Sequence, residues 1–319
     1  MQTVLVAGGA GFIGSHLCKK LLNDKYQVIA IDNLITGDRK NIDVLLRNKN
    51  FSFISYDISK DLKIGLELPH IDFIFHLASP ASPNKKSPRS YINHPIETLL
   101  VNSVGTYNLL ELAQKNNAKF LYASSSEIYG DPNVSPQKEN YFGNVNPNGV
   151  RSSYDEGKRF GEAITMAYIR KHNLDTRIIR IFNTYGPYMQ IDDGRVVSNF
   201  VNQAISNSPL TVYGSGKQTR SFCYIDDMVE GLRKAMFLDN TKGEVINLGN
   251  PDEKTILEIA RIIKKITNSS SKIVFEDLPQ DDPKSRNPDI NKANKLLDWQ
   301  PKIPLEKGLG QTIAYFKNL

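Results

Sequence analysis

Short apolar runs alternate with longer amphipathic stretches along the first half of the chain. The run at 4–7 has the length of a buried strand, and 12–23 repeats apolar residues at helical spacing. The predicted strands are 4–7, 26–31, 51–56, 73–77, 119–123 and 176–181, and the predicted helices are 12–23, 40–48, 94–116 and 153–171. Strands that alternate with helices predict an α/β fold, a doubly wound parallel sheet covered on both faces.

The second half of the sequence is less regular and is rich in Pro, Gly and Asn. Helices are expected at 197–206 and 256–267, and a strand at 243–248. We expect a large domain at 1–180, completed by parts of 221–250, and a smaller C-terminal lobe at 181–319. The Pro-rich segment 79–90 is expected to be a loop.

Composition narrows the classes of protein that the chain can represent. Its 319 residues are 40% hydrophobic and 23% charged, which is ordinary for a soluble globular protein. The apolar runs are too short to span a membrane, and no signal peptide precedes the first predicted strand. Cys18 and Cys223 are far apart and lack partners at metal-site spacing, so we expect a cytoplasmic protein without a metal.

The net charge of +6 could indicate nucleic-acid binding. The basic residues are scattered, however, and form neither a block nor a stripe interleaved with aromatic residues. A small anionic ligand such as a nucleotide diphosphate accounts for the excess charge equally well, so no nucleic-acid partner is expected.

A glycine-rich loop follows the first predicted strand and opens the first predicted helix. Gly8, Gly11 and Gly14 give the spacing G-x-x-G-x-x-G, and Gly9, Gly11 and Gly14 also satisfy G-x-G-x-x-G. Glycines there allow a pyrophosphate to approach backbone N–H groups at a helix N-terminus. The strand–turn–helix context makes this a Rossmann-type dinucleotide loop.

An acidic residue ends the second predicted strand. Asp32 lies 18 positions after Gly14 and can accept hydrogen bonds from ribose hydroxyls while repelling a 2′-phosphate. NAD is therefore favoured over NADP, although Arg39 and Lys40 lie nearby and leave NADP as the alternative.

Tyr154 and Lys158 are four residues apart on the predicted helix 153–171, and this spacing places them on one face. A neighbouring cation lowers the pKa of a phenol, which is about 10 when unperturbed. Such a tyrosine could take a proton from a sugar hydroxyl. The alternative is a half-exposed aromatic residue beside a solvated lysine.

Hydroxyl groups and a carboxylate follow the predicted strand 119–123, where strand ends face a ligand crevice. Ser125 could hydrogen-bond a substrate hydroxyl or the phenol, and Glu127 could act as acid or base or position a water. The alternative for Glu127 is a turn with a solvated carboxylate.

Together these motifs resemble the extended short-chain dehydrogenase/reductase family of NAD-dependent epimerases and dehydratases, over nearly the whole chain. Several longer strings, some of them in the second half, resemble the members of the family that decarboxylate UDP-glucuronate. These strings are His76-Leu-Ala-Ser-Pro-Ala-Ser-Pro83, Tyr154-Asp-Glu-Gly-Lys-Arg159, Ile181-Phe-Asn-Thr-Tyr-Gly-Pro187, Asp193-Gly-Arg-Val-Val-Ser-Asn-Phe200, Thr211-Val-Tyr-Gly-Ser-Gly216, Gln218-Thr-Arg220 and Asp281-Asp-Pro283 with Arg286.

The resemblance implies a closed redox cycle on tightly bound NAD. Tyr154, helped by Ser125, would take the proton of the sugar 4-hydroxyl while hydride passes to NAD+. The 4-ketone would allow loss of CO2 from C5, and the enolate would be reprotonated before NADH reduces the ketone. The product would be UDP-xylose.

The resemblance also assigns residues to roles. Lys158 would bind the nicotinamide ribose and lower the pKa of Tyr154, and Glu127 would hold the sugar or a water beside Ser126. The cofactor would contact Gly8, Gly11, Phe12, Ile13, Gly14, Asp32, Asn33, Asp57, Leu77, Tyr154 and Lys158. The UDP-sugar would contact Asn183, Val197, Thr211, Tyr213, Gln218, Arg220 and Arg286.

Alternatives within the resemblance remain open. Dehydratases of the dTDP-glucose type carry Asp where this chain has Ser126, whereas other 4,6-dehydratases and 4-epimerases share the scaffold. A non-catalytic redox sensor would be expected to lack Tyr154 or Lys158. The segment 84–90 looks longer than the family loop. The family commonly forms homodimers through two long helices, here 94–116 and 153–171.

Overall fold

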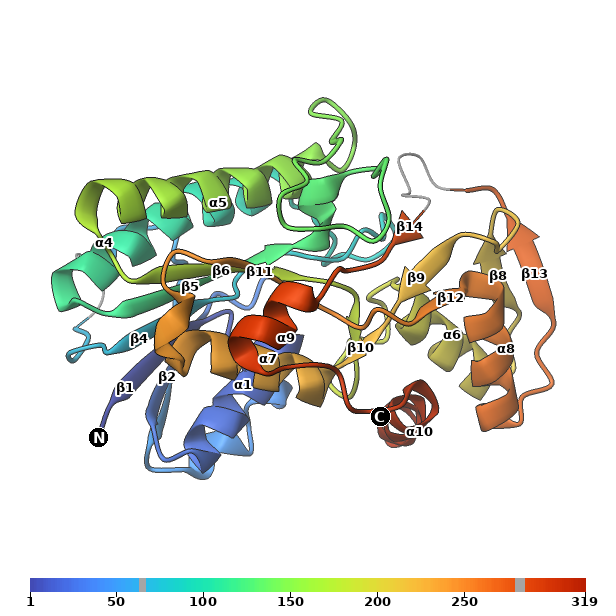
Figure 1. The fold of residues 1–319 in the computed structure, drawn as a ribbon. Helices are drawn as coiled ribbons and strands as arrows, with labels where there is room; N and C mark the ends of the chain where they lie inside the picture. The colour runs from blue at the N-terminus through green and yellow to red at the C-terminus, as the bar shows by residue number, and fades with distance from the viewer. Residues whose placement is uncertain (63–66, 279–284) are drawn as a thin grey trace.

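The protein is described from a computed structural model, which covers residues 1–62, 67–278 and 285–319. Its centre is a parallel seven-stranded sheet with the order β11-β6-β5-β4-β1-β2-β3 (Figure 1). In chain order these strands are β1 (Thr3–Ala7), β2 (Gln27–Asp32), β3 (Phe51–Ser55), β4 (Phe73–His76), β5 (Lys119–Ser125), β6 (Thr176–Ile181) and β11 (Val245–Leu248). The sheet confirms the doubly wound Rossmann-type fold.

Helices cover both faces of this sheet, as Figure 1 shows. One face carries α1 (Phe12–Asn23), α7 (Ile225–Phe237) and α9 (Asn291–Leu297), and the other carries α4 (Thr106–Asn116) and α5 (Ser152–His172). In β1, Val4 and Val6 join the apolar cluster that contains Leu17, whereas Leu5 and Ala7 join the cluster on the other face. Burial on both faces explains why the strands are apolar runs without alternation.

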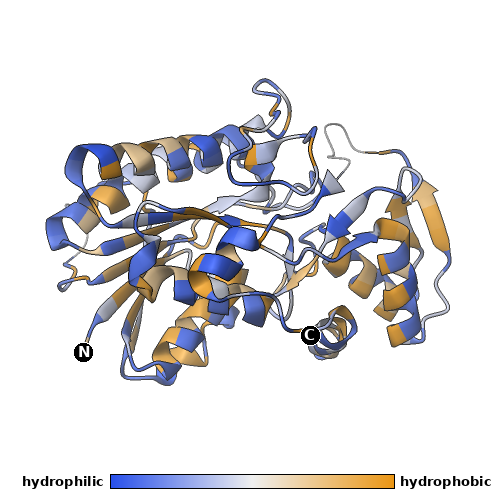
Figure 2. Cartoon of the chain, in the orientation of Figure 1, coloured by the Kyte–Doolittle hydropathy of each residue, from blue (hydrophilic) through white to orange (hydrophobic). Residues whose placement is uncertain are grey.

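The smaller lobe packs beside the sheet and contains short strands and helices (Figure 1). Its helices are α6 (Val196–Ile205), α8 (Ile256–Thr267) and α10 (Leu305–Phe316). Its strands form the pairs β8 (Leu210–Tyr213) with β13 (Ile273–Glu276) and β7 (Thr184–Tyr185) with β10 (Cys223–Tyr224), and a three-stranded sheet of β9 (Thr219–Ser221), β12 (Glu253–Thr255) and β14 (Ser285–Arg286). The buried side of α8 is apolar and its exposed side is polar (Figure 2), and Thr255 and Glu258 form its capping box.

The predicted helix at 40–48 is wrong. The segment forms two single turns, η1 (Arg39–Asn41) and η2 (Leu45–Arg47), closed by bonds such as Ile42 N to Arg39 O at 3.0 Å. The Asp38 side chain accepts from the Lys40 N–H and so closes a local turn in place of a longer helix. Asn, Asp and Val in this stretch have low helix propensity.

The predicted helix 94–116 exists but changes its winding in the middle. It consists of α3 (Pro95–Leu100), the π-helical turn η3 (Val101–Gly105) and α4. The Asn102 side chain in this turn donates to Thr98 O at 2.8 Å and accepts from the Tyr122 hydroxyl at 2.9 Å. The turn therefore fixes Asn102 against β5, which periodicity alone did not indicate.

Three helices, α7, α9 and α10, were not expected from the sequence. Among the described residues, no helix combines the length and the apolar character that crossing a bilayer requires.

Helix α5 lies unusually close to β5, and Gly161 makes this possible. A Cβ atom at Gly161 would lie 2.1 Å from the Tyr122 hydroxyl oxygen. We expect Gly161→Ala to lower the free energy of unfolding by about 1–3 kcal/mol because the helix must move away from the strand.

Gly310 in α10 provides the matched control, since a Cβ there would meet nothing within 4 Å. Gly310→Ala should raise the stability by roughly 0.5–1 kcal/mol through helix propensity. Urea unfolding of both variants checks the prediction, and equal effects of the two substitutions would contradict it.

Candidate active site

The glycine loop forms a tight cradle at the N-terminus of α1. Gly8 has a φ of +83°, and a Cβ there would lie 2.7 Å from Ala78 N. Gly11 is the N-cap residue of α1 and has no side chain to bond the N–H groups of the first turn. These groups are therefore available to a phosphate.

Asp32 ends β2 beside this cradle. Its side chain accepts from Ala10 N at 3.1 Å and from Leu34 N at 2.9 Å, which fixes both carboxylate oxygens. A Cβ at Gly37 would lie 2.9 Å from each of these oxygens, so glycine leaves the approach to the carboxylate open. A carboxylate has further lone pairs for ribose hydroxyls.

The catalytic side chains predicted from the sequence meet where β5 ends against α5. Ser125 ends β5, and its hydroxyl hydrogen-bonds the Tyr154 phenol. Lys158 is 3% exposed, and its Nζ donates to Ala123 O at 2.8 Å. The ammonium also lies over the Tyr154 ring, 5.7 Å from its centroid.

Burial, rather than Lys158, dominates the pKa of Tyr154 in the structure, and the expected lowering by Lys158 stays a prediction. Burial raises the pKa of the Tyr154 phenol to about 12, although the hydrogen bond with Ser125 opposes this shift. Burial also lowers the pKa of Lys158 to about 7, with Glu162 opposing the shift. The cost of burying a charge is therefore the largest effect on each of the two groups.

Glu127 lies in the single turn η4 (Ser126–Tyr129) between two guanidinium groups. Arg151 Nη2 pairs with its Oε2, and Arg286 Nε donates to its Oε1 at 3.2 Å. Burial alone would raise the pKa of Glu127, but Arg286 and Arg151 hold this pKa well below the usual carboxyl range. Glu127 is therefore an ionised acceptor and not a proton donor at neutral pH.

Two arginines of the smaller lobe face this carboxylate. Arg286 in β14 is the register partner of Arg220 in β9, and the charge of Arg220 also acts on Glu127. Arg286 is 1% exposed and donates to Gly130 O at 2.6 Å, while its Nη2 has no hydrogen-bond partner among the described residues. A buried guanidinium with a free donor suits an anionic ligand.

The structure places the other predicted substrate residues along the smaller lobe. Asn183 follows β6, and its buried Nδ2 lacks a partner among the described residues. Thr211 and Tyr213 lie on β8, where Gln203 contacts Thr211 and Gln218 donates to Tyr213 O at 2.7 Å. Val197 is buried in α6. The string at 281–283 lies outside the described residues.

The loop at 79–94 places Tyr91, which the sequence analysis did not single out, against the proposed catalytic tyrosine. Tyr91 stacks on Tyr154 with ring centroids 5.0 Å apart and planes 13° apart, and its buried hydroxyl has no partner among the described residues. Ser82 Oγ bonds Asp193 O, and Ser87 Oγ lies 3.5 Å from Asp192 Oδ2. The loop is thus tied to the segment that precedes α6.

Other missed residues also surround the phenol. The charge of Arg195, which pairs with Asp193, acts on Tyr154. Burial and the charge of Glu127 raise the pKa of Asp155 to about 8. Of these residues, only Arg151 could have been found from the sequence, because it lies one helical turn before Tyr154 and therefore on the same side of the helix.

Comparison with known proteins identifies the family of this chain. The family model described as "NAD dependent epimerase/dehydratase family" matches residues 4–249. UDP-glucuronic acid decarboxylase 1 of Xenopus tropicalis is 48% identical over 316 residues, which cover 99% of this chain and 72% of the relative. UDP-glucuronic acid decarboxylase 1 of Arabidopsis thaliana is 49% identical over 315 residues, covering 99% and 70%.

A solved structure of similar fold is UDP-glucuronic acid 4-epimerase from Bacillus cereus, in complex with UDP-glucuronic acid and NAD. It superposes with a TM-score of 0.85 at 32% identity, and the match covers 99% of both chains. With the family model matching most of its length, the chain belongs to the NAD dependent epimerase/dehydratase family.

Proposed function

We propose that the protein converts UDP-glucuronate to UDP-xylose and CO2 as a decarboxylase with tightly bound NAD. One observation carries the proposal: the Tyr154–Ser125 pair lies close to Glu127. Arg151 and Arg286 both pair with Glu127 and keep this carboxylate ionised. The near full-length likeness to UDP-glucuronic acid decarboxylases supports this choice of reaction. Epimerases and dehydratases share the scaffold, and no feature of the site favours either activity.

The glycine cradle and Asp32 fit NAD. Gly8, Gly11 and Gly14 would bring the pyrophosphate to the N–H groups of α1. Asp32 would accept from the adenosine ribose and disfavour NADP. Further proposed contacts are Phe12 and Ile13 on α1, Asn33 after β2, Asp57 after β3 and Leu77 after β4, all at one end of the sheet.

Each catalytic residue of the chain would have a separate role in the reaction. When bound, NAD would supply the acceptor for the C4 hydride and the donor for its later return. Tyr154 would remove the 4-hydroxyl proton, Ser125 would donate to the phenolate, and Lys158 would hold the nicotinamide ribose. With a ketone at C4, the C5 carboxylate leaves as CO2 and its electron pair enters the enolate, which gains a proton at C5.

The charge state of Glu127 restricts its role. An ionised Glu127 can accept hydrogen bonds from the sugar or from a water, but it cannot donate the proton to C5. Ser126 is buried beside it, and its hydroxyl is too weak an acid to expel the C6 hydroxyl as a dehydratase requires.

The smaller lobe would hold the nucleotide. Arg220 and Asn183 would bind the diphosphate, and Arg286 would contact the sugar or the nucleotide. Thr211 and Tyr213 would flank the uracil, with Val197 and Gln218 beside them. We accordingly propose a cofactor domain at 1–180 with parts of 221–250, and a substrate lobe at 181–319.

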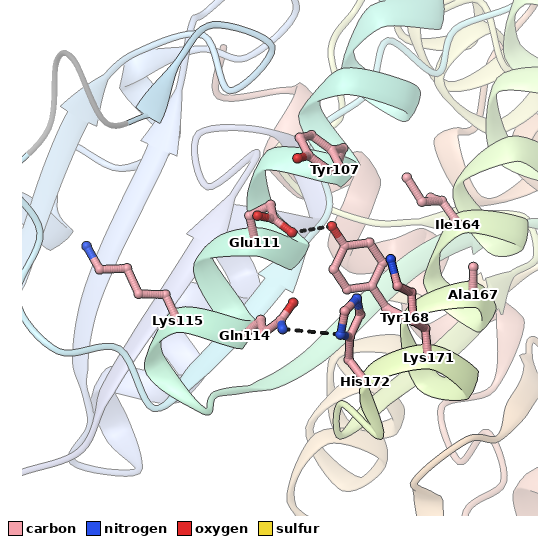
Figure 3. A pocket seen from close by; sticks show the side chains of 9 residues that line it. All are labelled: Tyr107, Glu111, Gln114, Lys115, Ile164, Ala167, Tyr168, Lys171 and His172. Atoms are coloured by element: carbon pink, nitrogen blue, oxygen red, sulfur yellow. Dashed lines mark hydrogen bonds between the residues drawn. The ribbon is translucent and has the colours of Figure 1, made fainter.

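We further propose that two copies pair through the long helical segment formed by α3, η3 and α4 together with α5. Apolar side chains are exposed along one helical line and on α5; they are Ile96, Leu99, Leu100, Val104, Tyr107 and Phe160. A shallow hollow between the two helices (Figure 3) is lined by Tyr107, Ile164 and Tyr168, among others, and lies several turns from Tyr154. A second copy would cover this surface.

We also propose a cytoplasmic location. Cys18 and Cys223 are both buried free thiols, which agrees with a reducing compartment.

The reaction is tested by incubating the NAD-loaded protein with UDP-glucuronate and recording the products by mass spectrometry. We expect CO2 and a UDP-pentose. Tyr154→Phe should reduce turnover by about 10²–10⁴-fold while NAD stays bound, because only the general base is lost. A C4 epimer that keeps its carboxylate, a 4-keto-6-deoxy product or unchanged substrate would each reject the proposal.

The ionised state of Glu127 predicts a pH-dependent contribution to stability. Its folded pKa lies below the unfolded value of about 4.3, so this contribution is complete at neutral pH and declines as the pH falls below about 5. Glu127→Gln should cost about 3 kcal/mol at pH 7 because two arginines lose their partner. Urea unfolding from pH 8 to 4 should show the difference shrinking in acid, and a constant difference would contradict the assignment.

The proposed dimer predicts a mass in solution of about twice the 35.9 kDa chain. Tyr107→Glu combined with Phe160→Glu should produce monomers, because charges would be buried in the contact. Val44→Glu, at an exposed apolar residue outside the helix pair, should leave the dimer intact. Light scattering measures all three proteins, and a monomeric parent protein would exclude the dimer.

A further inference from the structure

Three neighbouring residues at the end of β5 contact three successive turns of α5. The contacts are Ser125 with Tyr154, Ala123 O with Lys158 Nζ at 2.8 Å, and Ser124 Oγ with Glu162 Oε1 at 2.6 Å. The first two belong to the proposed catalytic pair. The third involves a carboxylate for which neither the sequence analysis nor the proposed reaction has a role.

Glu162 stands one helical turn beyond Lys158, on the same side of α5. The titratable groups that face Lys158 are His76 from β4, Tyr122 from β5, and Tyr154 and Glu162 from α5. Burial lowers the pKa of His76 to about 3, so this ring is neutral near pH 7. Glu162 is therefore the acidic side chain of this group, and it opposes the loss of the proton from Lys158.

Glu162 is held rigidly in this place. Arg180 in β6 donates to both of its oxygens, from Nε at 2.9 Å and from Nη2 at 2.8 Å. The same guanidinium donates to the Tyr129 hydroxyl at 2.9 Å and to Glu139 O at 2.8 Å. A carboxylate with a two-point partner and a serine donor keeps one position.

We propose that Glu162 is a positioning residue of the active site, which favours the ammonium form of Lys158 from the same side of α5 and, through Ser124, holds the catalytic face of α5 on the end of β5. Glu162 acts through Lys158 and need not touch the substrate. The inference rests on the proposed function only in taking Tyr154 and Lys158 as the catalytic pair.

The decisive measurement is the protonation of Lys158 itself. In protein labelled with ¹⁵N-lysine, the Nζ signal absent from a Lys158→Met variant identifies this group. Glu162→Gln should move its titration to lower pH by about one unit, because a neighbouring opposite charge is lost. Turnover near neutral pH should fall by roughly tenfold if the ammonium is the active form.

Two further variants separate the charge from the packing. Ser124→Ala removes a hydrogen bond to Glu162 but keeps its charge, so the Lys158 titration should stay near that of the parent. Glu162→Gln leaves Arg180 buried without a counter-ion and is expected to destabilise the fold. The double variant Glu162→Gln, Arg180→Met removes this unpaired charge, and the lowered Lys158 titration should persist in it.

An unchanged Lys158 titration in the double variant would overturn the inference. Recovery of parental turnover together with stability in that variant would also overturn it, because Glu162 would then serve only as the partner of Arg180. Failure of the parent protein to act on UDP-glucuronate would reject the proposed reaction but not the inference, since the titration is measured without substrate.

Discussion

The close seating of α5 on the carboxyl end of β5 is the constraint on which the site depends. Gly161 allows the approach, since any Cβ there would meet the Tyr122 hydroxyl. The hydrogen bonds from Lys158 to Ala123 O and from Ser124 to Glu162 then fix the rotation of the helix. Tyr154 meets Ser125 on the same side of the helix, one turn before Lys158.

A network of buried charged and polar side chains connects the contact between α5 and β5 to the smaller lobe. Arg180 binds Glu162 and the Tyr129 hydroxyl, and Tyr129 donates to Asn247 Oδ1 at 2.9 Å. The Asn247 amide in turn donates to Asp289 O, three residues from Arg286. Because an unpaired buried polar group is costly, the network favours one arrangement of the lobes, with Arg286 facing Glu127.

Local signals predicted the strands, most of the long helices and the glycine loop, because each depends on spacing or turn chemistry within a few residues. These signals wrongly predicted a helix at 40–48, where the Asp38 side chain closes a short turn. They also did not predict the π-helical turn at 101–105, which the hydrogen bond between Asn102 and Tyr122 stabilises. The short strands of the smaller lobe, such as β9 and β14, pair over more than sixty residues and carry no local periodicity.

The sequence by itself determined the Rossmann-type architecture, the dinucleotide loop with Asp32, and the residues that meet as the Tyr154, Lys158 and Ser125 group. Only the tertiary structure decided their charge states. Burial raises the pKa of Tyr154 and lowers that of Lys158, and two arginines from distant segments keep Glu127 ionised. A protonation equilibrium depends on dielectric and on neighbouring charges in space, and neither can be read from spacing along a chain.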